Sequence, residues 1–276
     1  MSRNSTSDQT PVYTHGHHDS VLRSHNTRTV KDSAAYLEHE LIAPRSLLDI
    51  GSGPGTITVD MARRLAPGTV TALETSDSAL ELTRQQALQA GVDNMAFVVG
   101  DVLALDFPDD HFDMVHAHQV LQHVSDPVQA LSEMRRVCRP GGLVAVRDAD
   151  YAGFVWYPAL PVLDEWMRLY QLAARSNAGE PNAGRHLLSW ALQAGFSAEQ
   201  IECTSSTWCL ATPERRQWWG GMWADRILHS RIATQLLESG AATQQDLDRI
   251  SHAWRDWAQT KDGWMSMMHG EIICRV

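Results

Sequence analysis

The feature that most constrains this chain is a glycine-rich turn between a short apolar segment and a helix. Residues 46–50 (SLLDI) have the length and apolar character of a buried strand, and Gly51, Gly53 and Gly55 follow directly. From Ile57 onward apolar residues recur every four positions, which indicates a helix. Glycines allow positive φ angles and let a ligand approach the backbone closely. This order predicts an α/β fold with a ligand at the turn, because open α/β sheets bind ligands beyond the carboxyl ends of their strands.

Strands and helices continue to alternate through the first half of the chain. The patterns predict two further helices, over 78–90 and from Asp126-Pro127 to Cys138, and strands at 69–73, 95–99, 112–117 and 143–146. Such alternation implies parallel βαβ units with helices on both faces of the sheet. We therefore expect a Rossmann-like, mostly parallel sheet.

The pattern changes after Asp150, and all ten tryptophans lie beyond it. Residues 151–190 and 213–262 look mostly helical, whereas 200–210 and 271–276 fit strands. We predict four parts: an N-terminal arm or lid (1–35), a Rossmann-like core (36–150), a helical cap on the substrate side (151–190 and 211–269), and return strands of the core (191–210 and 270–276).

Composition excludes several functional classes. The formal charge is −10, which disfavours nucleic acid as a partner because phosphate binding needs a basic face. No apolar run reaches the length of about 18 residues that a membrane span requires, and the polar N-terminus does not resemble a secretory signal. The four cysteines form no C-x-x-C pair, so we expect reduced thiols in a cytoplasmic protein. A homodimer is left open.

Acidic residues after the second and third predicted strands narrow the class of ligand. Glu74 lies 21 residues after Gly53, where its carboxylate can accept hydrogen bonds from ribose hydroxyls. Asp101 can accept a bond from an adenine amino group, and the Val102 N–H can face a ring nitrogen. A dinucleotide fingerprint would need a third glycine where Thr56 stands. The spacing D-x-G-x-G-x-G instead resembles the class I methyltransferases.

A longer segment carries a closer resemblance. The stretch FPDDHFDMVHAHQVLQHVSDPVQALSEMRRVCRPGG is similar, nearly throughout, to the UbiE-like methyltransferases, named for C-methylation of ubiquinone and menaquinone precursors. The resemblance covers residues 45–150, less than half of the chain. It implies a seven-stranded sheet with an antiparallel last strand, and S-adenosylmethionine as cofactor. The tryptophan-rich remainder departs from these enzymes, so their substrate cannot be transferred to this chain.

The expected function is therefore methyl transfer from S-adenosylmethionine to a small molecule. Two alternatives are a cofactor-binding module without catalysis and, less favoured, a nicotinamide-dependent oxidoreductase. The predicted cofactor contacts are Asp49, Gly51, Ser52, Gly53, Gly55, Thr56, Glu74, Thr75, Asp101, Val102, His118, Gln119 and Tyr13.

Several histidines are candidates for chemistry. His118 and His123 follow the fourth predicted strand, near where an acceptor should bind, so either is a candidate general base. His116 shares a strand face with His118, and core packing is the simpler interpretation of that pair. The tract 15–18 (HGHH) lacks companion ligands, so we expect no metal. Tyr13 and His18 there either close over the cofactor and acceptor or belong to a solvated arm.

The tryptophans have two interpretations. Most would fill the core of the helical part, whereas Trp156, Trp219 and Trp223, together with His18, are candidate acceptor-binding residues. We expect the sheet to supply few basic residues near its carboxyl edge. These observations predict a mostly apolar, aromatic or isoprenoid-like acceptor.

Overall fold

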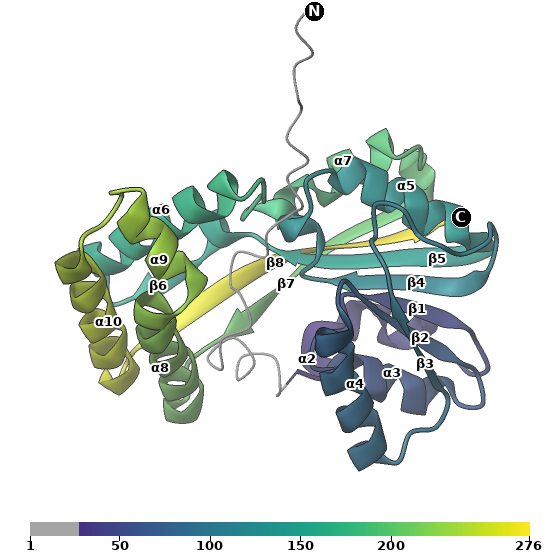
Figure 1. Cartoon of the computed structure of the whole chain (residues 1–276), viewed down its shortest axis with the longest axis horizontal. Coiled ribbons are helices and arrows are strands. Elements are labelled where there is room, and N and C mark those ends of the chain that lie inside the picture. The colour runs from purple at the N-terminus through teal and green to yellow at the C-terminus, as the bar shows by residue number, and fades with distance from the viewer. Residues whose placement is uncertain (1–27) are drawn as a thin grey trace, which may run out of the picture.

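The computed structural model describes residues 28–276, and an eight-stranded mixed sheet runs through it (Figure 1). The strand order is β3-β2-β1-β4-β5-β8-β6, and β7 pairs with β8. Neighbours from β3 to β5 are parallel, whereas β8 is antiparallel to β5, β6 and β7. The strands are β1 (Leu47–Ile50), β2 (Val70–Glu74), β3 (Met95–Val99), β4 (Phe112–His118), β5 (Cys138–Ala149), β6 (Val155–Tyr157), β7 (Ile201–Cys209) and β8 (Trp264–Arg275).

The expected α/β sheet is confirmed, with one addition. All seven expected strands are present, and β6 is an eighth, in a region whose pattern predicted helix. Its three residues are too few to show a strand period. β8 is also much longer than the segment 271–276 that the sequence indicated. Its first residues leave the parallel part of the sheet and pair with β6 instead.

Helices cover both faces of the parallel strands because neighbouring residues of each strand point to opposite sides. Leu47 packs with α3 on one face, and Leu48 packs with α5 and α7 on the other. The elements of this part are α2 (Val30–Ser33), η1 (Ala35–Glu40), α3 (Thr56–Leu65), α4 (Asp77–Ala90), η2 (Leu121–His123), α5 (Pro127–Val137), η4 (Ala183–His186), α7 (Leu187–Gln193) and η5 (Ala198–Gln200).

Local sequence signals determine where two of these helices begin or end. Asp126 accepts a hydrogen bond from the Gln129 N–H at 2.9 Å and caps α5, whose first residue is a proline. Gly91 ends α4 in the left-handed conformation, with φ of 65°. Both ends agree with the sequence-based expectation.

The remaining helices form a second lobe around the far end of β8 (Figure 1). They are η3 (Tyr151–Gly153), α6 (Pro161–Ser176), α8 (Pro213–His229), α9 (Arg231–Glu238) and α10 (Gln244–Gln259). Trp166, Trp223, Trp254 and Trp257 are fully buried there. The ring of Trp166 lies edge-on to those of Trp223 and Trp254, at centroid separations of 4.6 and 4.8 Å. These four tryptophans therefore form the core of the helical lobe.

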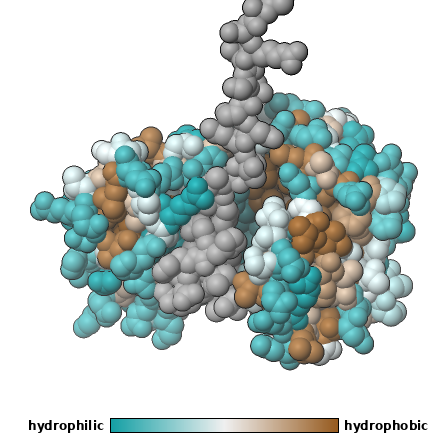
Figure 2. All heavy atoms as spheres, viewed as in Figure 1, coloured by the Kyte–Doolittle hydropathy of each residue, from teal (hydrophilic) through white to brown (hydrophobic). Residues whose placement is uncertain are grey.

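The face shown in Figure 2 carries mainly hydrophilic residues along the outer margins of both lobes. Across residues 28–276, no helix combines the length and apolar character needed to cross a membrane. The four cysteines are free thiols, and Cys138 and Cys274 among them are buried.

The tryptophan core predicts a large effect on stability. Trp223→Ala should lower the free energy of unfolding by about 3–5 kcal/mol, because it removes a fully buried ring and leaves a cavity. Urea denaturation followed by far-ultraviolet circular dichroism measures this loss. Trp264→Ala is the matched control and should cost clearly less, since Trp264 is 39% exposed. Equal losses in the two variants would contradict this account of the lobe.

Candidate active site

A cavity of about 550 Å³ lies between the carboxyl ends of the parallel strands and the helical lobe. Residues just beyond β1, β2, β3 and β4 line one part of it, and residues of η3, β7, α8 and β8 line the other. This is the position at which open α/β sheets bind ligands. The volume lies within the range of about 300–1,000 Å³ that small-molecule sites usually have.

The glycine turn forms one wall of the cavity. Gly51 and Gly53 have φ angles of 70° and 56°, which favour glycine, and both line the cavity. A Cβ atom on Gly51 would come within 2.5 Å of the Val120 side chain. Gly55, also a predicted contact, is instead the residue before α3, where a Cβ would collide with Thr83. The described lining of the cavity does not include Gly55, so its place in the structure is explained by the packing of α3 against α4.

The buried carboxylate of Asp49 connects the elements on either side of the glycine turn. One of its oxygens accepts a hydrogen bond from the Thr58 hydroxyl at 2.5 Å, and the other lies 2.7 Å from Nδ1 of His116. Because a carboxylate accepts, Nδ1 of His116 carries the proton. Asp49 therefore ties the end of β1 to α3 and β4, and this pairing explains His116 as a structural residue.

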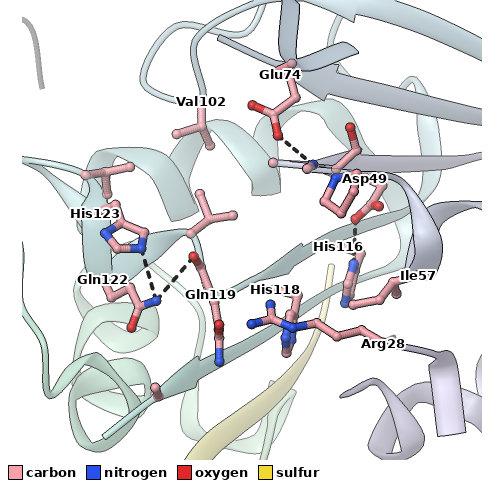
Figure 3. Close-up of a pocket in the computed structure, with 18 of the residues that line it drawn as sticks. Arg28, Asp49, Ile57, Glu74, Val102, His116, His118, Gln119, Gln122 and His123 are labelled. Carbon is pink, nitrogen blue, oxygen red and sulfur yellow. Dashed lines mark hydrogen bonds and ion pairs between the residues drawn. The ribbon is translucent and has the colours of Figure 1, made fainter. Parts of the chain in front are cut away.

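Glu74 ends β2 beside the turn (Figure 3). Its Oε1 accepts the Gly53 N–H at 2.6 Å, and its Oε2 accepts the Thr75 N–H at 3.3 Å. The predicted contacts Ser52, Thr56 and Thr75 line the cavity with it. A carboxylate fixed in this way at the cavity wall fits a pair of hydroxyl groups such as those of a ribose.

Asp101 and Val102 follow β3 and line the same part of the cavity. The Asp101 side chain accepts the Leu103 N–H at 2.9 Å, which fixes the direction of its carboxylate. Val102 is buried and offers an apolar surface beside that carboxylate. An apolar wall next to a hydrogen-bond acceptor fits a purine base with an exocyclic amino group.

His118 ends β4 and faces the middle of the cavity (Figure 3). Its side chain is almost completely buried, and neither ring nitrogen has a hydrogen-bond partner among residues 28–276. Burial holds its pKa well below the usual value, and the positive charges of Arg147 and Arg28 lower it further. His118 is therefore neutral at pH 7.

Gln119 is held in a left-handed conformation, with φ of 55°, and its amide points to β8. Its Nε2 donates to Nε2 of His269 at 3.0 Å, because Nδ1 of His269 donates to the Met267 carbonyl at 3.0 Å. Burial lowers the pKa of His269 well below its usual value, which keeps the ring neutral. Sequence analysis missed His269, since it lies 150 residues from Gln119 without a motif around it.

Gln122 and His123 belong to η2 and lie beside Gln119 (Figure 3). The Gln122 amide donates to Nε2 of His123 at 3.1 Å, so the single proton of the neutral ring is on Nδ1. Burial lowers the pKa of His123 to about 4. Both candidate bases therefore line the cavity as neutral imidazoles, but His123 already uses one ring nitrogen.

Aromatic side chains line the part of the cavity near the helical lobe. Trp219 is there as expected, together with Tyr151, Phe154 and Trp208, which the sequence had not singled out. Trp223 is instead in the core of the lobe, and Trp156 packs partly buried against that core. The described lining includes neither Trp156 nor Trp223. The predicted contacts Tyr13 and His18 lie outside the described residues.

Two basic residues reach this edge of the sheet from other elements, which the sequence analysis did not anticipate. Arg28 and Arg226 both line the cavity. Arg226 comes from α8 and Arg28 from the segment before α2, so neither follows a strand of the sheet. Their position depends on how the lobe and the N-terminal segment pack against the core, which no local pattern reveals.

Comparison with known proteins identifies the sequence family to which this chain is similar. Residues 45–225 match the model of a family described as a methyltransferase domain. An uncharacterized methyltransferase of Schizosaccharomyces pombe is 35% identical over 270 residues, which are 95% of each chain. The ubiquinone/menaquinone biosynthesis C-methyltransferase UbiE of Hahella chejuensis is 37% identical, but over 48% of this chain and 51% of its own. The likeness to UbiE is thus confined to about half of the chain.

A solved structure shows the same fold. Phosphoethanolamine N-methyltransferase 2 of Haemonchus contortus, in complex with phosphomonomethylethanolamine and S-adenosylhomocysteine, superposes with a TM-score of 0.54 at 18% identity. The alignment covers 85% of this chain and 49% of the worm enzyme, so this chain spans about half the length of that protein.

A buried carboxylate behind the site positions Gln122 and His123. Asp148 lies on β5, fully buried, and accepts the N–H groups of Leu121 at 3.3 Å and Gln122 at 3.2 Å. Burial raises its pKa to about 7, although the two N–H bonds oppose this shift. Its ionisation is therefore coupled to the stability of the fold.

This coupling predicts a pH dependence. Between the unfolded pKa of 3.8 and the folded pKa of about 7, the folded protein retains a proton that the unfolded chain has lost. Asp148 therefore makes stability fall as pH rises through this window, by roughly 4 kcal/mol in total. Asp148→Asn keeps an acceptor for the two N–H groups and removes the titration. Relative to wild type, the variant should gain stability between about pH 4 and about pH 8 in urea denaturation.

The control for this measurement is Asp164→Asn, which changes an exposed carboxylate on α6. Its stability difference from wild type should change little with pH. A constant difference between wild type and Asp148→Asn across the window would contradict the prediction.

Proposed function

The chain belongs to the methyltransferase-domain family, and we propose that it transfers a methyl group from S-adenosylmethionine to a small, mostly apolar or aromatic acceptor. One observation carries this proposal. A single cavity joins residues suited to a nucleoside, at the ends of β1 to β3, to aromatic side chains from the helical lobe. Both substrates of a methyl transfer must meet in one enclosed space, because the acceptor atom has to lie close to the methyl carbon.

The core residues fit S-adenosylmethionine as cofactor. Glu74 would accept hydrogen bonds from the two ribose hydroxyls, Asp101 and Val102 would contact the adenine, and the turn around Gly51 would approach the ligand closely. The cofactor, when bound, supplies a methyl group already activated on a sulfonium. The remaining predicted contacts in the described chain, His118 and Gln119, face the region between this part and the aromatic wall.

Residues of this chain orient the acceptor and receive its proton. Trp219, Tyr151 and Phe154 bury an apolar ring and exclude water from it. A hydroxyl or amine acceptor loses a proton, and the neutral His118 is placed to take it, because the unprotonated nitrogen of its ring has no hydrogen-bond partner among the described residues. His123 is the second candidate base, through Nε2, the unprotonated ring nitrogen that accepts a hydrogen bond from the Gln122 amide. An activated carbon acceptor would release its proton afterwards.

Three finer predictions belong to the same proposal. The helical lobe, predicted as 151–190 and 211–269, serves as the acceptor side, and residues 36–150 as the cofactor side. The third part is the arm or lid predicted as 1–35, with Tyr13 and His18, of which residues 1–27 lie outside the described residues. The protein works in the cytoplasm on a small molecule and not on nucleic acid, which agrees with its charge of −10.

A turnover screen tests the proposal directly. The purified chain is incubated with S-adenosylmethionine and a panel of phenols, indoles and quinols, and formation of S-adenosylhomocysteine is measured. We expect turnover with at least one class, and a thermal shift with S-adenosylmethionine but not with NAD. A cofactor-dependent shift without turnover of any acceptor would favour a binding module, and a shift with NAD alone would favour an oxidoreductase.

The role of Glu74 yields a quantitative prediction. Glu74→Ala should weaken binding of S-adenosylhomocysteine about tenfold or more, because hydrogen bonds to a charged group contribute about 1.5–3 kcal/mol. Isothermal titration calorimetry measures the affinity. Glu81→Ala removes an exposed carboxylate from α4 and should leave the affinity unchanged. Unchanged affinity in Glu74→Ala would remove Glu74 from the cofactor site.

A further inference from the structure

Two arginines enter the aromatic part of the cavity from different elements. Arg28 precedes α2, and Arg226 belongs to the last turn of α8. The Arg28 guanidinium lies over the Trp208 ring, 5.0 Å from its centroid, and Arg226 lies over Trp223 at 4.9 Å. Stacking on indole rings fixes the planes of both guanidinium groups.

The positive charges of the two arginines lower the pKa values of side chains that line this part of the cavity. Arg28 extends toward His118 (Figure 3), and its charge lowers the pKa of both His118 and His269. Burial raises the pKa of Tyr151, and the charges of Arg226 and Arg28 both oppose that rise. One phenol therefore lies within the field of both guanidinium groups.

The carboxylates that line the cavity lie at the ends of the parallel strands, away from its aromatic part. Among the described residues that line it, the acidic ones are Asp49, Glu74 and Asp101, which end or follow β1, β2 and β3. Both oxygens of Asp49 are engaged with Thr58 and His116. The aromatic part thus has two cationic side chains and, within residues 28–276, no acidic one in its lining.

We propose that the acceptor carries an anionic group, a carboxylate on an aromatic body, and that Arg226 and Arg28 bind it. This inference rests on the proposed function and names the class of substrate for the same site. A guanidinium binds a carboxylate through two parallel N–H···O bonds, which are strong where water is excluded. Arg226 is almost completely buried, so its charge acts in a weakly screened environment. The surrounding rings of Tyr151 and Phe154 then hold the apolar body.

Small probes test the inference without knowledge of the natural acceptor. Benzoate, benzamide and phenyl phosphate share one ring and differ in the attached group. Each is titrated calorimetrically into the full chain saturated with S-adenosylhomocysteine. We expect benzoate to bind about tenfold or more tightly than benzamide, because the amide lacks the charge. Tighter binding of phenyl phosphate than of benzoate would support an anionic acceptor and change the assigned group from a carboxylate to a phosphate ester.

Variants of the two arginines test whether these residues cause the preference for benzoate over benzamide. Arg226→Gln should reduce the preference for benzoate to about threefold or less, and Arg226→Lys should retain part of it, since a lysine keeps the charge without the planar fork. Arg28→Gln, at a less buried position, is the second variant should Arg226→Gln fail to fold. Arg231→Gln, on the exposed start of α9, is the matched control and should behave as wild type.

The outcomes separate this inference from the proposed function. Equal binding of benzoate and benzamide, no measurable benzoate binding, or a preference that survives both Arg226→Gln and Arg28→Gln would overturn the inference while S-adenosylhomocysteine still binds. Turnover of neutral phenols alone would do the same. Failure of wild type to bind S-adenosylhomocysteine would overturn the proposed function and the inference together.

Discussion

The buried carboxylate of Asp49 is the contact on which the site depends. It joins the end of β1 to Thr58 of α3 and to His116 of β4, with both oxygens used. A buried charge is tolerated when every oxygen accepts a hydrogen bond, and each partner here comes from a different element. The glycine turn connects β1 to α3 and lines the cavity, so the contact that joins these two elements also holds the two ends of the turn.

Further polar side chains lie on the neighbouring strands β4, β5, β8 and β7. Arg147 on β5 pairs in register with His118 on β4 and with Glu271 on β8. Its guanidinium lies 3.0 Å from the Glu271 carboxylate, which also accepts hydrogen bonds from Ser206 and Thr204 of β7. A buried ion pair of this kind is costly unless its groups are satisfied, and here two hydroxyl groups complete the carboxylate. Burial lowers the pKa of His118, and the positive charge of the neighbouring Arg147 lowers it further, so this imidazole stays neutral.

The long strand β8 links the two parts of the molecule. Its residues 269–275 pair with β5 in the core, and its residues 264–266 pair with β6 at the helical lobe. His269, which accepts a hydrogen bond from Gln119, is the first residue of the part that pairs with β5. The strand therefore carries the aromatic lobe to the carboxyl edge of the parallel strands, where acceptor and cofactor can share one cavity.

The sequence by itself determined the core fold and the part of the cavity wall at the ends of β1, β2 and β3. Gly51, Glu74 and Asp101 each follow a strand whose period and end signals are local, so their common edge could be inferred from the topology of parallel βαβ units. The part of the cavity near the helical lobe depended on the tertiary structure. Arg28, Arg226 and His269 come from segments that no short-range pattern connects, and only packing of the lobe against the core brings them together. Trp219 and Trp223 are both buried one turn apart on α8, and only the tertiary structure shows that Trp219 lines the cavity whereas Trp223 packs in the core of the lobe.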